Sequence, residues 1–417
     1  MGPSPRPRRR LLPLKAALSL ALTAVLAEAL LHVAPSLIPS SYRRLYPLHG
    51  AGFYAPDLLD RTPIREVPLP LYVGDYVGLP PADLAGIGLV APEENPDPLE
   101  YPEVEVRVDE LGFPNPSRSV PDRADVILVG DSFLVGAGAK RPAGLQALLA
   151  AALGQSVYNL GVAALGPYQE LWLLATQGLP KRPSLVIWFF FGGNDTLDAA
   201  TTLLHEKRGE DTYGKVHAGR RPPVLRLPAI VRYLVGTERE EARIEPLPGL
   251  VLRSPDGGAR RLWMHPNYLL LLSKTTEQWE ADRSWAATKD VLRDARARTE
   301  AAGARFVLVY LPSKAQVVLP YVDRDPDLVH RMANFRRPVV PTGPPEEFLA
   351  AALAHRGDLE DLMQAFCAAE GIAYVSATPG LEALARRGDL GYLAADTHWA
   401  PRGQEALLPA LLAVLRE

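Results

Sequence analysis

From residue 125 onward, short hydrophobic runs alternate with longer amphipathic segments, and this alternation constrains the fold more than any other feature of the chain. The expected strands are rich in β-branched and aromatic residues and lie at 125–129, 156–159, 184–191, 305–311 and 372–376. The expected helices lie at 144–153, 168–177, 268–302, 359–369, 381–387 and 403–415. Strands this apolar are typical of burial on both faces, and right-handed crossovers then give a parallel, doubly wound α/β sheet with helices on both faces.

One block, residues 196–266, interrupts the alternation. It begins with a polar, basic stretch that contains HEKRGEDTYGKVHAGRRPP and ends with GLVLRSPDGGARRLWM. The second stretch predicts a hairpin that turns at residues 255–258, because Pro-Asp-Gly-Gly supplies the backbone angles of a tight turn. We therefore expect an insertion that forms a flap or a small subdomain.

The N-terminus, residues 1–39, has the features of a targeting segment. Arginines at positions 6, 8, 9 and 10 precede a mostly apolar stretch at 11–33, whose uncharged centre at 16–27 is short for a membrane span. An uncleaved transmembrane signal anchor, which we favour, would use all of residues 11–33, whereas a cleaved signal peptide would use the small-residue site at 27–29. Either one places the rest of the chain outside the cytoplasm, and a soluble amphipathic helix is the third alternative.

Composition bounds the remaining possibilities. Many of the chain's 41 prolines fall between residues 35 and 122, and we expect residues 40–122 to be an irregular membrane-proximal segment before a catalytic domain at 123–417. The net charge of −3 leaves no footprint for nucleic acid. A single cysteine, Cys367, excludes an internal disulfide framework and a multi-cysteine metal site, and we expect neither a metal nor a cofactor.

Polar residues and glycines follow several of the expected strands at the point where each strand ends. Ser132 follows the first strand, Gly161 the second and Gly-Gly-Asn-Asp at 192–195 the third, and Asp-Thr-His-Trp at 396–399 lies between the last strand and the C-terminal helix. Each motif alone is an ordinary turn or helix cap. Because ligands of parallel α/β sheets bind beyond the carboxyl ends of the strands, the joint placement predicts a functional site at this edge.

These motifs resemble the four blocks of the SGNH (GDSL-type) hydrolases, in the order Ser, Gly, Asn, His, over roughly residues 110–417 outside the insertion. The resemblance implies a flavodoxin-like sheet of order 2-1-3-4-5. It also implies that Ser132 is the nucleophile, His398 the base and Asp396 the partner of the histidine. The implied oxyanion hole consists of the backbone N–H groups of Ser132 and Gly161 and the side chain of Asn194.

The chemistry of these residue types agrees with the implied roles. A hydroxyl that attacks an ester carbonyl must lose its proton, and a neutral imidazole is the side chain best matched to this task near pH 7. The developing oxyanion needs donors that are fixed in advance, which backbone N–H groups at a glycine turn and an Asn amide can supply. An aspartate close to the histidine can orient the ring and stabilise the imidazolium.

One departure from the common pattern indicates a branch of the family. Many members have the acid three residues before the histidine, at the position of Ala395, whereas this chain has Asp396 two residues before His398. That spacing resembles the branch related to alginate O-acetyltransferases, and so do FVLVYLPSKAQVVLP at 306–320 and DELGFPNP at 109–116. The branch implies an extracytoplasmic, often membrane-anchored domain that moves acetyl groups on exopolysaccharides.

Two residues are candidates for substrate contact, namely Lys314 and Trp399, although a solvated loop lysine and a packing tryptophan are the ordinary alternatives. We predict a serine esterase or O-acyltransferase that acts on acylated cell-surface or secreted polysaccharide, and we expect the acyl group to be acetyl. A transferase would need a membrane-bound partner that exports acetyl groups. The alternatives are a lipase or thioesterase of the same class, and a catalytically weak glycan-binding component of the cell envelope.

Overall fold

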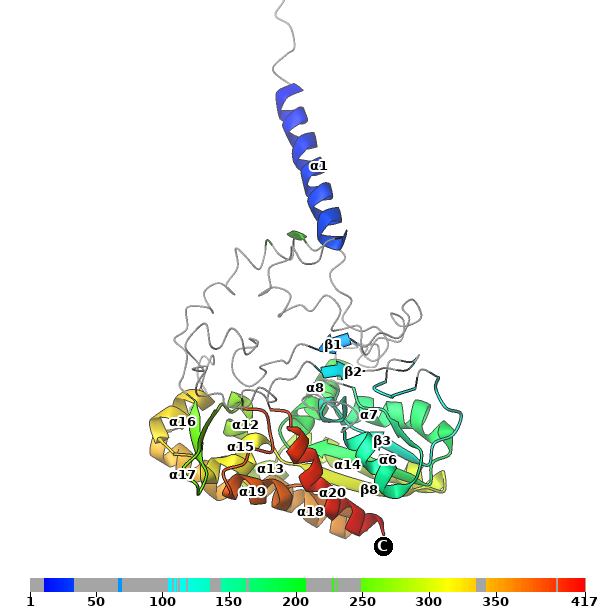
Figure 1. The fold of residues 1–417 in the computed structure, drawn as a ribbon, viewed down its shortest axis with the longest axis vertical. Coiled ribbons are helices and arrows are strands. Elements are labelled where there is room, and N and C mark those ends of the chain that lie inside the picture. The colour runs from blue at the N-terminus through cyan, green and yellow to red at the C-terminus, as the bar shows by residue number, and fades with distance from the viewer. Residues whose placement is uncertain are drawn as a thin grey trace, which may run out of the picture. The chain divides into compact units, whose positions relative to one another are not determined.

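The computed structural model describes residues 11–33, 67–69, 104–106, 109, 111, 113–117, 119–135, 144–162, 165–207, 227–228, 231, 249–334, 343–394 and 397–416. The chain divides into two compact units, one made of residues 1–51 and 220–245 and the other of residues 52–219 and 246–417. The second unit contains the large sheet shown in Figure 1. Most of the proline-rich segment at 40–122 lies outside the described residues, and domain boundaries at residues 39 and 122 stay predictions.

The central sheet has five parallel strands, in the spatial order β4-β3-β5-β8-β9. Their bounds are β3 (Val126–Val129), β4 (Val157–Asn159), β5 (Leu185–Phe191), β8 (Arg305–Leu311) and β9 (Ala373–Ser376). Each strand falls inside its expected range, so these five predictions are confirmed. The strand numbers in this order differ from the expected 2-1-3-4-5 because β1, β2, β6 and β7 belong to other sheets. Counted within the sheet alone, the strands run second, first, third, fourth, fifth.

Helices connect and follow these strands. Before the third strand they are α5 (Ser132–Val135), α6 (Leu145–Leu153) and α7 (Pro167–Leu173), which continues as a π-helical turn at Leu174–Gly178 and a 3₁₀ turn at Leu179–Lys181. Between β5 and β8 they are α8 (Asp195–Lys207), α12 (Pro266–Leu271), α13 (Thr276–Glu280) and α14 (Arg283–Ala301). After β8 they are α15 (Lys314–Val318), with a 3₁₀ turn at Leu319–Tyr321, then α16 (Pro326–Ala333), α17 (Pro345–His355), α18 (Asp358–Glu370), α19 (Thr378–Arg386) and α20 (Pro401–Leu415).

Both faces of the sheet are covered by helices (Figure 1). The odd-numbered residues of β5 belong to one hydrophobic cluster, which α6, α12, α16, α17, α19 and α20 complete. The even-numbered residues belong to a second cluster, completed by α7, α14 and α18. Successive side chains of a strand point to opposite faces, so burial on both sides explains why Leu185–Phe191 is an unbroken apolar run.

The expected helix at 268–302 is divided into α12, α13 and α14, because two side chains restart it. Thr275 caps α13 by accepting a hydrogen bond from the Gln278 N–H, and Asp282 caps α14 by accepting one from the Ser284 N–H. A helical period alone cannot locate such interruptions, since the apolar pattern continues across them.

The expected insertion at 196–266 is described mainly at its two ends. Its beginning belongs to α8, which starts at Asp195 directly after the β5 motif. Its end contains the predicted hairpin, which is confirmed: β6 (Leu250–Arg253) pairs with β7 (Ala259–Leu262) in antiparallel fashion. Gly257 in the turn has φ +90°, an angle that favours glycine. A second antiparallel pair, β1 (Val67–Leu69) with β2 (Val104–Val106), lies in the same unit.

The expected N-terminal helix is present as α1 (Leu11–Val33). Among the described residues, however, no helix combines the length and the apolar character needed to cross a membrane. The structure therefore does not support the transmembrane anchor that the sequence analysis favoured.

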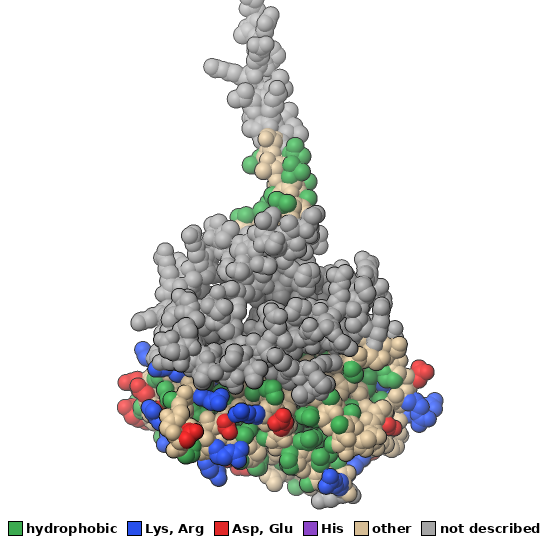
Figure 2. All heavy atoms as spheres, viewed as in Figure 1, with side chains coloured by type: hydrophobic (Ala, Val, Ile, Leu, Met, Phe, Trp, Pro, Cys, Tyr) green, Lys and Arg blue, Asp and Glu red, His purple; other side chains and the backbone are tan. Residues whose placement is uncertain are grey.

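Charged side chains of both signs are interspersed on the visible face of the larger unit (Figure 2). This distribution agrees with the small net charge of −3.

Candidate active site

The nucleophile candidate lies where the chain leaves the sheet. β3 ends at Val129, and Ser132 is the first residue of α5. The intervening turn is tight, since a Cβ on Gly130 would lie 3.0 Å from the carbonyl oxygen of Phe189 in the neighbouring strand. The buried Asp131 side chain fixes the turn by accepting a 3.0 Å hydrogen bond from the Phe133 N–H through Oδ1. The serine is thereby held at the carboxyl edge of the sheet.

The histidine candidate lies beside this serine, although it comes from the C-terminal part of the chain. His398 Nε2 lies 2.7 Å from Ser132 Oγ, which is hydrogen-bond distance, although 266 positions separate the two residues in sequence. The neighbours of both residues are packed together as well. The Phe133 ring lies 5.0 Å from the imidazole, and the Trp399 indole N–H donates a 3.3 Å hydrogen bond to the Phe133 carbonyl. Packing on both sides of the pair therefore sets the direction of the imidazole.

The acid candidate, Asp396, lies outside the described residues, as does Ala395. The described chain resumes at Thr397, and the base of the loop is closed by a 2.9 Å hydrogen bond from the Leu393 N–H to the His398 carbonyl. The membership of Asp396 in a triad stays a prediction.

Two of the three oxyanion-hole candidates, Gly161 and Asn194, already have acceptors within the protein. The Gly161 N–H donates a 2.8 Å hydrogen bond to Asn159 Oδ1, and Asn194 Nδ2 donates a 2.6 Å hydrogen bond to Asp198 Oδ2. An Asn amide carries two hydrogens, so one N–H of Asn194 is left for a ligand. A Cβ on Gly161 would come within 2.4 Å of Leu134 Cβ, which explains why glycine occupies this position beside α5. The oxyanion hole stays a prediction.

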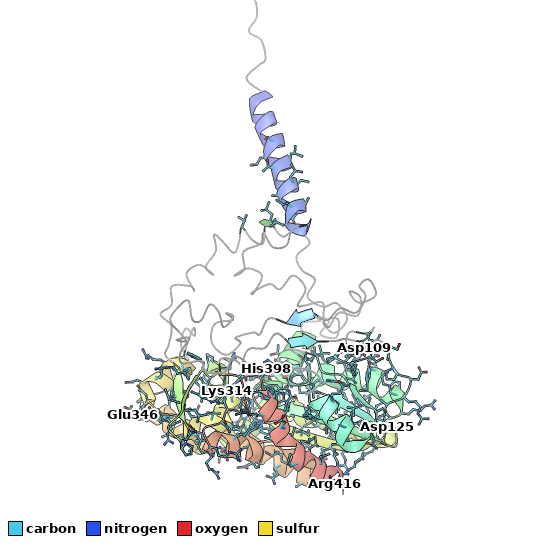
Figure 3. All side chains as sticks on the ribbon, in the orientation of Figure 1. Asp109, Asp125, Lys314, Glu346, His398 and Arg416 are labelled. Carbon is cyan, nitrogen blue, oxygen red and sulfur yellow. The ribbon has the colours of Figure 1, made fainter. Side chains whose placement is uncertain are left out.

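The two candidates for substrate contact are both inside the protein. Trp399 is 1% exposed and packs edge-on against Phe133, the residue that follows Ser132. Lys314 is also 1% exposed, and its ammonium donates hydrogen bonds to the carbonyl oxygens of Leu393 and Ala394. Figure 3 labels Lys314 and His398 in the larger unit. Burial of this extent leaves neither side chain a surface for a bound polysaccharide in this structure.

A hydrogen-bonded network behind the nucleophile was not found by sequence reasoning. Asp109 accepts from Asn115 Nδ2 at 3.0 Å and from the Tyr158 hydroxyl at 2.7 Å, and Asn115 in turn accepts from the Asn159 N–H at 2.9 Å. Asn159 Nδ2 donates a 2.7 Å hydrogen bond to the carbonyl of Leu134 in α5. The network ties the DELGFPNP segment to β4 and to the nucleophile helix. The polar residues Asp109 and Asn115 of that segment, which are buried, were the sequence signal that could have indicated the network.

Three carboxyl groups are buried behind the site, on Asp131, Glu170 and Asp195, which are at most 2% exposed. Burial raises the pKa of Asp131 to about 6, although the Phe133 N–H and the nearby His398 act in the opposite direction. Burial and then the charges of neighbouring carboxyl groups raise the pKa of Glu170 and of Asp195 well above the ordinary value. Among the described residues, no group of three or more acidic, histidine or cysteine side chains could hold a metal ion.

A parallel α/β sheet with a Ser–His pair at its carboxyl edge is the arrangement of a serine hydrolase. Residues 128–406, well over half of the chain, match the model of the GDSL-like Lipase/Acylhydrolase family. The chain belongs to this family of ester-hydrolysing enzymes, also called SGNH hydrolases. No curated protein matches the chain at a significant level.

Solved structures similar to the chain include three esterases or lipases. Phospholipase A1 from Streptomyces albidoflavus NA297 is 16% identical, with 70% of this chain and 98% of that chain covered and a TM-score of 0.36. The extracellular lipase from Streptomyces rimosus has the same identity and coverage and a TM-score of 0.37. The acetyl xylan esterase AlAXEase is 10% identical, with 70% and 98% covered and a TM-score of 0.33. These similarities are too low to identify a substrate.

Proposed function

We propose that the chain is a serine esterase or O-acyltransferase that forms an acyl-enzyme on Ser132. The observation that carries the proposal is the 2.7 Å distance between His398 Nε2 and Ser132 Oγ. In the first step His398 takes the proton of the hydroxyl while Oγ attacks the ester carbonyl, and it then returns the proton to the departing alkoxide. In the second step the same imidazole deprotonates the acceptor that attacks the acyl-serine, and it gives this proton to Ser132 Oγ as the bond between Oγ and the acyl carbon breaks.

We further propose that the acyl group is acetyl and that the substrate is a cell-surface or secreted polysaccharide. The support is the resemblance of three segments to the alginate O-acetyltransferase branch: the two-residue spacing of Asp396 and His398, the Pro-Ser-Lys segment at 312–314, and DELGFPNP at 109–116. The acceptor is water in an esterase and a sugar hydroxyl in a transferase. Transfer would also require an acyl donor outside the cytoplasm, which a membrane-bound acetyl-exporting partner could supply.

The proposal is tested by incubating the protein with an acetyl ester, with and without a polysaccharide acceptor. Mass spectrometry should detect an acetyl group on Ser132, and Ser132→Ala should lose at least about 10³-fold of the turnover while keeping its circular dichroism spectrum. Full turnover by folded Ser132→Ala would disprove the nucleophile. A strong preference for long-chain acyl esters would replace the polysaccharide proposal with a lipase.

Export of the catalytic unit is a separate proposal. It rests on the arginines at positions 6, 8, 9 and 10 before the apolar α1 segment, because positive charge is retained on the cytoplasmic side. A reporter that works only outside the cytoplasm should be active when it is fused after Glu417. Activity of a strictly cytoplasmic reporter at this position would disprove export.

A further inference from the structure

Lys314 occupies a position that is unfavourable for a lysine. It is the first residue of α15, whose preceding Ser313 caps the helix by accepting from the Gln316 N–H. A positive charge at a helix N-terminus lies at the unfavourable end of the helix dipole. The side chain is also 1% exposed, and a buried ammonium is costly unless it is fully hydrogen-bonded. An apolar residue would fill the same space without either cost, so the ammonium itself has a role.

The ammonium holds the loop that carries His398. Lys314 Nζ lies 2.9 Å from the Leu393 carbonyl oxygen and 3.1 Å from that of Ala394. The Ala394 carbonyl also accepts a 2.9 Å hydrogen bond from the Trp263 N–H. The same Leu393 that binds the ammonium through its carbonyl binds the His398 carbonyl through its N–H, at 2.9 Å. Lys314 is therefore separated from the backbone of the histidine by one residue.

A second contact joins the same two segments. The Tyr392 hydroxyl donates a 2.8 Å hydrogen bond to the Pro312 carbonyl, and Tyr392 forms a β-bridge with Trp399. Pro312 and Lys314 both follow the end of β8, a central strand of the sheet. The segment before His398 is thus attached to the residues that follow β8, and its bridge to Trp399 extends this attachment past the histidine.

We propose that Lys314 is a positioning residue for His398: its ammonium fixes the loop so that the imidazole stays within hydrogen-bond distance of Ser132. The inference rests on the proposed function, because it assigns the base of that reaction. It replaces a direct contact between Lys314 and substrate. A displacement of about 1 Å in such a pair can cost about 10²-fold in rate, so a residue that only holds a loop can control turnover.

The test compares Lys314→Met with Lys181→Met. Lys181 is a matched control, because it is also buried and donates to a backbone carbonyl, that of Pro121, at 2.9 Å. In the chain Lys181 precedes β5, and its carbonyl accepts a hydrogen bond from the N–H of Ala124, which lies just before β3. Lys181 is therefore near the opposite end of β3 from Ser132. Methionine keeps the length of the side chain and removes the donors. The probe is a fluorophosphonate, whose rate of reaction with Ser132 reports the Ser–His pair without a natural substrate.

We expect Lys314→Met to slow labelling and kcat by about 10²-fold with KM nearly unchanged, whereas Lys181→Met should stay within about twofold of the unsubstituted protein. Labelling of Lys314→Met at the unsubstituted rate would overturn the proposal. So would a raised KM with unchanged kcat, which would make Lys314 a substrate contact. If Lys314→Met does not fold, Lys314→Gln keeps N–H donors on a shorter side chain, and its labelling should be slowed about tenfold or more; an unchanged rate would overturn the proposal.

Failure of the proposed function gives a different result. In that case the unsubstituted protein would show neither turnover nor labelling that depends on Ser132. The positioning of the histidine is then measured by NMR of the imidazole of His398, assigned with His398→Gln. Lys314→Met should shift or broaden this resonance, and Lys181→Met should leave it in place. An unchanged resonance in Lys314→Met would overturn the positioning role independently of catalysis.

Discussion

Ser132, His398 and Lys314 are held in place by contacts between segments that lie far apart in the sequence. Ser132 and His398 were predicted to meet because both follow strands of one parallel sheet, and they lie at hydrogen-bond distance. The burial of Lys314 could not be predicted, since a lysine after a strand carries no periodic signal. Lys314 is buried because residues 392–394 pack against the segment that follows β8. There the Tyr392 hydroxyl donates to the Pro312 carbonyl, and the Lys314 ammonium donates to the Leu393 carbonyl. Contacts of this kind become visible only in the folded chain.

Asp396 is the residue whose role depends most on experiment. Asp396 is not the N-cap of α20, because Ala400 occupies that position. If Asp396 orients His398, Asp396→Asn should lower turnover steeply, on the order of 10⁴-fold as in a serine-protease triad, while the unfolding midpoint changes little. Asp389→Asn is the control, since it removes an exposed ion pair with Arg402 in the same region and should leave turnover unchanged. Normal turnover in Asp396→Asn would leave a Ser–His dyad.

Among the elements, strands were predicted better than helices. The five strands of the sheet lie in short, mostly apolar runs rich in β-branched and aromatic residues, and both features favour a strand over a helix. The hairpin was predicted from its turn residues, which act locally. Both signals are contained in a short window of sequence, and the structure confirms both.

Helices were missed where their boundaries depend on side chains or on the tertiary fold. α15, α16 and α17 were not expected, although Ser313 and Asp325 cap the first two by accepting backbone N–H bonds. Ser and Asp also occur in loops, so a cap is informative only when an apolar period follows it. α15 is too short to show such a period, and its five residues are all buried.

The whole molecule is needed to assemble the site. Ser132 comes from the first strand connection of the sheet, whereas His398 precedes the last helix, α20, which packs against α6, α19 and β9. The hydrogen bond between them therefore joins the segment after the first strand of the sheet to the segment before the C-terminal helix. Because the same region buries three carboxyl groups, the free energy of unfolding of the whole molecule is linked to the protonation of the site.

This linkage has a definite sign for Asp131. Burial raises its pKa from the ordinary 3.8 to about 6, so between these values the folded protein holds a proton that the unfolded chain has released. The stabilisation is complete below about pH 3.8 and is lost as the pH rises to about 6. The loss amounts to roughly 3 kcal/mol for a pKa difference of this size. Above about pH 6 this group adds no further change.

Asp131→Asn should remove this dependence, because the amide cannot ionise and its oxygen can still accept from the Phe133 N–H. Urea unfolding at pH 4, 5, 6 and 7 should show the variant gaining stability relative to the unsubstituted protein up to about pH 6, after which the difference should be constant. Asp125→Asn is the control. The hydrogen bonds from Ser156 lower the pKa of this exposed carboxyl group, so its contribution is lost only as the pH falls below about 3.8 and its difference should be constant from pH 4 to 7. A constant difference for Asp131→Asn over the same range would show that Asp131 is already ionised in the folded protein at pH 4, and that the buried site tolerates its charge.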